Sequence, residues 1–85
     1  MNTFFILEYQ ASNNGSASAL PPLGYTVSNQ EEEAVLVAAF FTKCAAAAQS
    51  ACDTHTIQIV TSEGETWNGY KQIFRHGHKV SDDAE

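Results

Sequence analysis

Hydrophobic and polar residues near the start of the chain follow the pattern of a β-strand. Thr3–Gln10 is rich in aromatic and branched side chains, which favour extended backbone. Alternate residues of a strand point to opposite faces, which gives two apolar groups: Phe5, Leu7 and Tyr9, and Phe4 and Ile6. Because both faces are apolar, we expect this strand to be central or covered on both sides.

The next segment lacks such a pattern. Ala11–Ala19 is rich in serine, asparagine and glycine, which predicts a flexible loop. Pro21 and Pro22 have no N–H group, so we expect them at a sheet edge or outside the sheet. Leu23–Val27 predicts a short second strand.

The strongest helical pattern begins at residue 28. Ser28 and Glu31 fit a capping box with the serine as N-cap. Alanine dominates from residue 34 to residue 51, without glycine or proline. One broad stripe is expected to be buried: Leu36, Val37, Phe40, Phe41, Cys44, Ala47, Ala48 and Ala51. Four residues are expected on the opposite, solvent side: Thr42, Lys43, Gln49 and Ser50.

The remaining chain reads as two strands joined by a tight turn. In His55–Thr61 the two isoleucines face one way, and the other face carries Thr56, Gln58 and Val60. Ser62–Glu65 predicts a hairpin turn, with glycine supplying a positive φ. Trp67–His76 is the expected returning strand, which Gly77 ends or bends. Alternation places Trp67, Ile73 and Arg75 on one face of this strand and Tyr70, Phe74 and His76 on the other.

These elements predict an α+β fold, with residues 1–85 as a single domain. We expect one α-helix packed on a three- to four-stranded antiparallel sheet, in the order β-(β)-α-β-β, with a flexible loop at about 11–22 and an acidic tail at 81–85. One helix covers only one sheet face, so the other is expected to expose residues such as Phe4, Ile6 and Val60. An exposed apolar face is typical of a partner surface, and a homodimer through it is a further prediction.

Length and charge narrow the classes of function. The chain has 85 residues and a net charge of −6, which is too short for a two-domain enzyme or a doubly wound nucleotide-binding sheet. Residues 66–80 hold three bases and no acid: Lys71, Arg75 and Lys79. The net negative charge of the chain disfavours direct binding to nucleic acid. With neither a signal peptide nor a membrane-spanning run in the pattern, the predicted location is the cytoplasm.

The cysteines and histidines are weak candidates for chemistry. On one helix, Cys44 and Cys52 would lie about 12 Å apart, too far for a disulfide, so reduced thiols are expected. His76 and His78 could join His55 or Cys52 around zinc, but the cysteine spacing matches no common zinc pattern. Cys52 and His55 are close in sequence without forming a nucleophile motif. We therefore predict no catalytic residue, no metal ligand and no cofactor.

Two segments are candidates for binding a partner. Trp67–Lys79 interleaves aromatics with bases, which suits core packing, a protein interface or, third, nucleic acid. The acidic run Glu31–Glu33 stabilises a helix start, and with Glu63, Glu65 and the tail it could meet a basic groove. The predicted partner-binding residues are Glu31, Glu32, Glu33, Trp67, Tyr70, Lys71, Arg75, His76 and Lys79.

The layout also resembles a known family. The strand Thr3–Gln10, the helix start Ser28-Asn-Gln-Glu-Glu-Glu-Ala and the hairpin Thr56–Lys79 resemble small anti-CRISPR proteins of phages and mobile elements in order, size and acidity. No shared motif carries the resemblance. It implies a stoichiometric inhibitor that blocks a CRISPR surveillance complex in the host cytoplasm. We thus expect a non-enzymatic, phage-encoded protein that binds a host complex handling nucleic acid. The alternative is a nucleotide or small-anion binding module using residues 67–79.

Overall fold

A computed structural model describes residues 2–12, 15–50 and 52–82 of the chain, and for residues 81 and 82 the backbone alone. Its elements are β1 (Asn2–Ala11), β2 (Ala17–Ala19), β3 (Leu23–Val27), α1 (Gln30–Ala47), β4 (Thr54–Thr61), β5 (Thr66–Arg75) and β6 (His78–Asp82). The predicted α+β class, with one helix and an antiparallel sheet, is confirmed for this part of the chain. The predicted strand count is wrong, because the described sheet has six strands.

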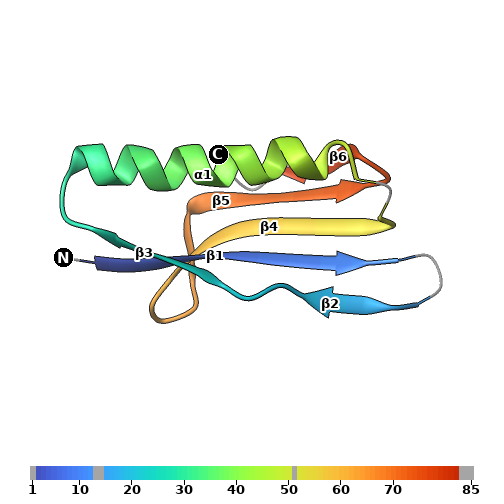
Figure 1. Cartoon of the computed structure of the whole chain (residues 1–85), viewed down its shortest axis with the longest axis horizontal. Coiled ribbons are helices and arrows are strands. Elements are labelled where there is room, and N and C mark those ends of the chain that lie inside the picture. The colour runs from blue at the N-terminus through green and yellow to red at the C-terminus, as the bar shows by residue number, and fades with distance from the viewer. Residues whose placement is uncertain (1, 13–14, 51, 83–85) are drawn as a thin grey trace.

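The long first strand organises the sheet. One edge of β1 pairs with β3 over its first half and with β2 over its last three residues, and its other edge pairs with β4. β5 and β6 then continue the sheet, and every pair is antiparallel. Helix and strands run along the longest dimension of a molecule that measures 41 × 19 × 18 Å (Figure 1).

The two unpredicted strands are short and carry little pattern of their own. β2 lies inside the segment predicted as a flexible loop, and it forms because the end of β1 offers a free edge to Ala17–Ala19. β6 begins directly after Gly77, which was predicted to end or bend the returning strand. His76 and Gly77 have φ angles of 52° and 80°, as a two-residue hairpin turn requires, and they return the chain onto β5. Residues 83–85 of the predicted acidic tail lie outside the described residues.

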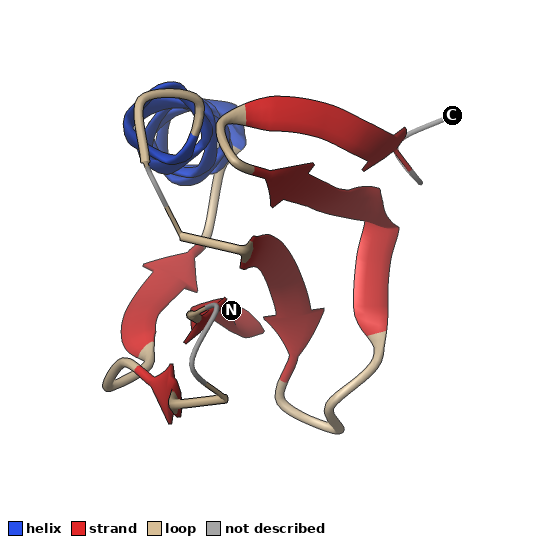
Figure 2. Ribbon diagram, turned by 90° about the vertical axis from the view of Figure 1, so that its right-hand side faces the viewer, coloured by secondary structure: helices blue, strands red, loops and turns tan. Residues whose placement is uncertain are grey.

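The core lies between α1 and one face of the sheet (Figure 2). Four residues of the predicted helical stripe are buried: Leu36, Phe40, Cys44 and Ala47. They pack against Phe4, Ile6, Ile57, Ile59 and Phe74. Phe41 was also predicted to be buried but is 46 % exposed, and Ala51 lies outside the described residues. The stripe is therefore narrower than its apolar composition indicates.

The sheet face that the helix leaves open differs from the predicted one. Phe4, Ile6 and Val60 were expected to be exposed, but their exposed fractions are 7 %, 1 % and 4 %. Register explains the first two, because Ile6 lies directly across from Ile59 and shares its helix-covered face. Val60 does lie on the uncovered face, across from Phe5, and is nevertheless buried.

The helix starts one residue later than predicted. Asn29 is the N-cap, and its side-chain oxygen accepts a 2.9 Å hydrogen bond from the Glu32 N–H. The Glu32 carboxylate in turn accepts from the Ser28 N–H at 2.7 Å. The helix therefore has a capping arrangement of the predicted type, but it is shifted by one position. Asparagine caps a helix as well as serine does.

A register shift in β5 changes which way its aromatics point. The pair Val60–Thr66 is followed by Gln58–Lys71, so β5 accommodates extra residues there, with Asn68 and Gly69 at positive φ. Trp67 and Tyr70 were predicted to lie in opposite phases. Both instead pack against the helix-side core, which is the reading that the sequence favoured first.

Candidate functional site

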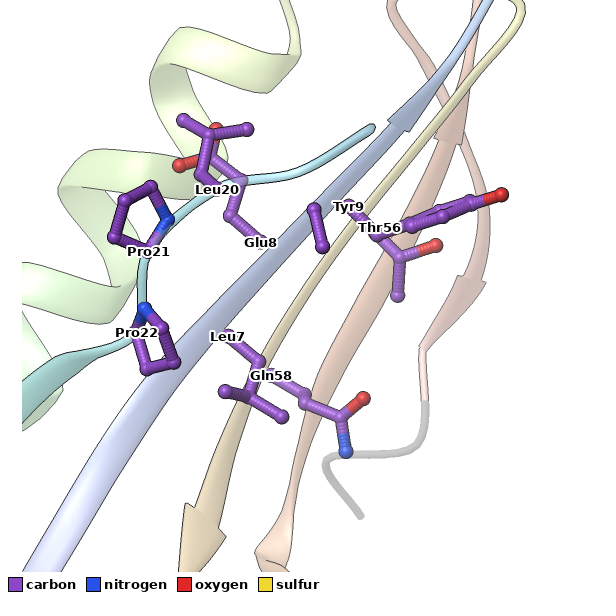
Figure 3. Close-up of a pocket in the computed structure, with 9 residues that line it drawn as sticks. Leu7, Glu8, Tyr9, Leu20, Pro21, Pro22, Thr56 and Gln58 are labelled. Atoms are coloured by element: carbon purple, nitrogen blue, oxygen red, sulfur yellow. The ribbon is translucent and has the colours of Figure 1, made fainter. Parts of the chain in front are cut away.

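The uncovered face of the sheet contains a hollow where β2 passes into β3. It measures about 430 Å³, and its walls come from β1, β4 and the β2–β3 connection (Figure 3). We call it the front hollow: Leu7, Glu8, Tyr9, Ala19, Leu20, Pro21, Pro22, Thr56 and Gln58. Its volume is in the range of small-ligand sites, and most of its lining side chains are apolar.

The two prolines create the front hollow. Neither can donate a backbone hydrogen bond, so the chain cannot continue the β2 ladder through them, as was predicted from the sequence. Leu20 makes the last backbone hydrogen bond to β1 before the prolines: its N–H donates to the Glu8 carbonyl at 2.9 Å. The connection then crosses beside β1 and pairs again only from Leu23, which lies across from Ile6.

Cations border the front hollow. Lys71 lies across from Gln58, and Ile73 and Arg75 follow on the same face of β5. The described carboxylate side chains lie at the helix start, in the two loops flanking β4 or, for Glu8, on the helix side of β1. Lys71 and Arg75 form no ion pair with a described residue. The uncovered face is therefore locally basic although the chain is acidic.

A buried polar cluster lies behind β1, on the helix-covered side. The Glu8 carboxylate is 3.1 Å from Lys43 Nζ through one oxygen and 2.6 Å from His55 Nε2 through the other. The cluster therefore ties together α1, β1 and β4. Lys43 was predicted to face solvent; its long side chain instead reaches back over the sheet, as lysine stems commonly do. A smaller hollow of about 190 Å³, which we call the rear hollow, opens beside Glu8 and Lys43.

The cluster favours an ionised Glu8. Burial by itself would raise the pKa of this carboxyl, but hydrogen bonds and charge from His55 and Lys43 outweigh it and hold the pKa below its usual 4.5. An ionised carboxylate only accepts, so His55 Nε2 carries the proton in their hydrogen bond. His55 Nδ1 is buried and has no hydrogen-bond partner among the described residues.

The predicted partner-binding residues fall into three separate groups. Glu31, Glu32 and Glu33 are exposed in the first turn of α1. At the same end of the molecule lies the β4–β5 turn with Glu63 and Glu65 (Figure 1). No described base lies in that turn or in the first turn of the helix. We call these five glutamates the acidic end.

The aromatic pair forms the second group. Trp67 stacks on Phe4 with ring centroids 4.8 Å apart, and Tyr70 lies 5.5 Å from the ring of Phe40. Both are half-buried on the helix side, whereas Lys71 and Arg75 belong to the uncovered face. The fold therefore does not gather the aromatics and bases of this hairpin on one surface.

The third group lies along β5 and the turn and strand that follow it, and it begins with Lys71 and Arg75 on the uncovered face. His76 Nε2 is 3.1 Å from Asp53 Oδ1, and Lys79 in β6 lies across from Phe74. Gly77 brings this turn against the helix end, where an added Cβ would lie 2.7 Å from the Ala48 carbonyl oxygen. Within the described ranges no three His, Cys, Asp or Glu side chains are grouped to hold a metal ion.

No disulfide joins Cys44 and Cys52, as predicted. Cys44 is buried under the helix, and Cys52 is half-buried with its thiol 3.6 Å from Gln10 Oε1. The acid and histidine closest to Cys52 in sequence have other partners, Asp53 with His76 and His55 with Glu8. Neither Asp53 nor His55 therefore hydrogen-bonds to the Cys52 thiol.

Neither the polar cluster nor the front hollow was predicted from the sequence. The sequence did contain a sign of the cluster. Alternation places Glu8 on the same strand face as Phe4 and Ile6, and a single carboxylate on an apolar face needs partners. His55 likewise has the parity of Ile57 and Ile59. The front hollow had no comparable signal, since it needs the pairing of β1 with both β2 and β3.

Comparison of the chain with protein-family models, curated proteins and solved structures finds no match. No helix in the described part of the chain is long and apolar enough to cross a membrane.

Proposed function

We propose that this chain is a non-enzymatic module that binds another protein through the uncovered face of its sheet. The observation that carries the proposal is the front hollow on a face that no helix covers. Tyr9 is 44 % exposed there, and Phe5, Leu7 and Ile73 are only half-buried. Apolar surface of this kind favours association because a partner removes it from water.

The acidic end supports a more specific form of the proposal. Five glutamates at one end of a 41 Å long molecule produce a directional field, and such a field speeds encounter with a basic partner. Basic grooves are typical of complexes that hold nucleic acid. We propose a phage-encoded inhibitor that occupies such a groove in a host defence complex, such as a CRISPR surveillance complex, and excludes its nucleic acid.

Affinity capture from nuclease-treated lysates, with matched CRISPR-positive and CRISPR-negative strains, tests this proposal. We expect stoichiometric recovery of a nucleic-acid-handling complex, which then fails to bind its DNA in a gel-shift assay. A captured complex that binds DNA normally would contradict the inhibitor, and the absence of any stoichiometric partner would contradict the binding module.

Charge variants identify the contacting surface. Glu32 helps to cap the helix, so the cleaner acidic variant is Glu31→Lys with Glu33→Lys. The basic variant is Lys71→Glu with Arg75→Glu, and Lys79→Glu is its matched control on the other face. We expect the first two variants to weaken capture. The basic variant should leave thermal unfolding unchanged, whereas the acidic variant should lower the unfolding temperature slightly because glutamates stabilise the helix start. Capture that is insensitive to both would show that neither surface contacts the partner.

A further inference from the structure

The front hollow has a chemical preference that the apolar face alone does not reveal. One wall is the strap Leu20–Pro22, and the floor is formed by Leu7 and Tyr9 of β1. Thr56 and Gln58 supply hydroxyl and amide groups along the β4 side. The hollow therefore accepts an apolar side chain and offers hydrogen-bonding groups to the atoms beside it.

A cation stands one strand away from the hollow. Lys71 is paired in register with Gln58, and neighbouring strands lie about 4.8 Å apart. The Lys71 side chain is half-buried on this face and has no ion-pair partner among the described residues. A carboxylate next to the apolar group in the hollow would meet this uncompensated charge.

We propose that the front hollow anchors an extended segment of the partner protein in which an acidic residue stands two positions away from an apolar one, on the same side of the segment. In an extended chain, successive side chains point to opposite sides and alternate ones lie about 6–7 Å apart. This spacing allows one apolar side chain to enter the hollow while a nearby acid approaches Lys71. The inference rests on the proposed protein-binding function and names the part of the partner that the face recognises.

Charge distinguishes this occupant from the others that an apolar sheet face could take. Two copies packed face to face would bring Lys71 and Arg75 of each into one interface, and none of the described acids lies on that face to compensate them. A nucleic acid would supply the anion, but Trp67 and Tyr70, the hairpin aromatics available for stacking, pack on the helix side. An acidic, apolar segment satisfies both the hollow and the cation.

The test uses two blocked peptides and amide chemical shifts of the whole ¹⁵N-labelled chain. In one peptide leucine and aspartate stand two positions apart with serine between them, so that both lie on the same side, and in the other lysine replaces each aspartate. We expect the aspartate peptide to shift the amides of Leu7, Tyr9, Gln58 and Lys71 saturably. No shift, or equal binding of the lysine peptide, would overturn the proposal. The same shifts caused by dilution of the chain alone, or by an oligothymidylate, would identify a second copy or nucleic acid and also overturn it.

Matched variants locate the contact. Leu7→Ser should weaken the aspartate peptide about tenfold by removing apolar contact, whereas Leu23→Ser, an exposed leucine on the helix side, should not. Lys71→Gln should weaken it about two- to fivefold, as expected for one solvent-screened ion pair, and Lys79→Gln should leave it unchanged. Equal effects of the test and control variants would overturn the assignment to this hollow.

The two proposals fail in distinguishable ways. If a partner is captured and neither Leu7→Ser nor Lys71→Gln weakens its capture, the hollow is not the anchor and the binding module stands. If the peptide binds as expected and no partner is captured, the hollow is a binding site and the proposed inhibitor is wrong.

Discussion

The two faces of this sheet are similar in apolar content but differ in how far their side chains are buried. Phe4 and Ile6 on one face of β1 are almost fully excluded from water, whereas Leu7 and Tyr9 on the other remain partly exposed. β1 contributes comparable side chains to both faces, so its composition does not determine which face becomes part of the core. The choice comes from α1, which covers the face that also carries Ile57 and Ile59.

The faces also treat charge differently. On the covered face the Glu8 carboxylate is paired with both Lys43 and His55. On the uncovered face Lys71 and Arg75 form no ion pair with any carboxylate that the structure describes. The Glu8 carboxylate is largely removed from water and is therefore compensated within the molecule, whereas an exposed charge can remain available to a partner. The contrast separates a structural ion cluster from a candidate recognition surface.

The largest expected effect compares apolar truncation on the two sides of the sheet. Phe40→Ala removes a fully buried ring of α1 and should lower the free energy of unfolding by about 3–5 kcal/mol. Tyr9→Ala on the uncovered face should cost about 1 kcal/mol or less. Urea denaturation followed by circular dichroism measures both, with Phe40→Leu as the milder core variant if alanine prevents folding. Equal losses would mean that the uncovered face is part of the core.

A second comparison uses two glycines at positive φ, of which one touches the helix end. Gly77→Ala combines backbone strain with a Cβ at 2.7 Å from the Ala48 carbonyl, so we expect a loss of about 2–3 kcal/mol. Gly64→Ala has the same strain but open space around it and should cost about 1 kcal/mol. Thermal unfolding distinguishes the two, and similar losses would argue against close docking of the β5–β6 turn on the helix.

The polar cluster around Glu8 predicts a contribution to the stability of the fold that is lost in acid. The folded state holds the pKa of Glu8 below its usual 4.5, so this stabilisation is present above that pH and disappears as pH falls through the folded value. Glu8→Gln should cost about 1–2 kcal/mol at neutral pH and progressively less below pH 4.5. Glu63→Gln, at the exposed β4–β5 turn, is the control and should change little. Parallel pH curves for Glu8→Gln and the unsubstituted chain would show that Glu8 does not act as described.

The smallest effect tests where the covering helix begins. Asn29→Ala removes the side chain that accepts from the Glu32 N–H and should cost about 1 kcal/mol. Ser28→Ala should cost only a few tenths, because Ser28 contributes its backbone N–H to the cap. Equilibrium unfolding of the pair measures the difference. A larger loss for Ser28→Ala would restore the capping box that the sequence predicted.

Local pattern was sufficient for the main elements. Period-two alternation located β1 and β4 to within a residue, and Leu23–Val27 was assigned correctly as β3. It failed for β2 and β6, whose short segments become strands because β1 and β5 offer free edges. It also failed for Trp67 and Tyr70, because a register shift inside β5 breaks the alternation on which the phase assignment depended.

The candidate site was only partly accessible from the sequence. The expectation of an uncovered sheet face was right, but Phe4 and Ile6 were placed on the wrong side. The roles proposed for the acidic run and for Lys71 and Arg75 stay predictions. The front hollow could not be foreseen, because it is built from residues that meet only when β2 and β3 share one edge of β1.

By itself, the sequence determined the class of fold, the existence and approximate ends of the long elements, and the separation of acidic and basic segments. These follow from periodicity, capping chemistry and composition, which act over a few neighbouring residues. The tertiary structure alone decided which face of β1 became the core, which lysine reached Glu8, and where a hollow remained open. Those outcomes depend on register and on the placement of one helix, which bring together residues far apart in the chain.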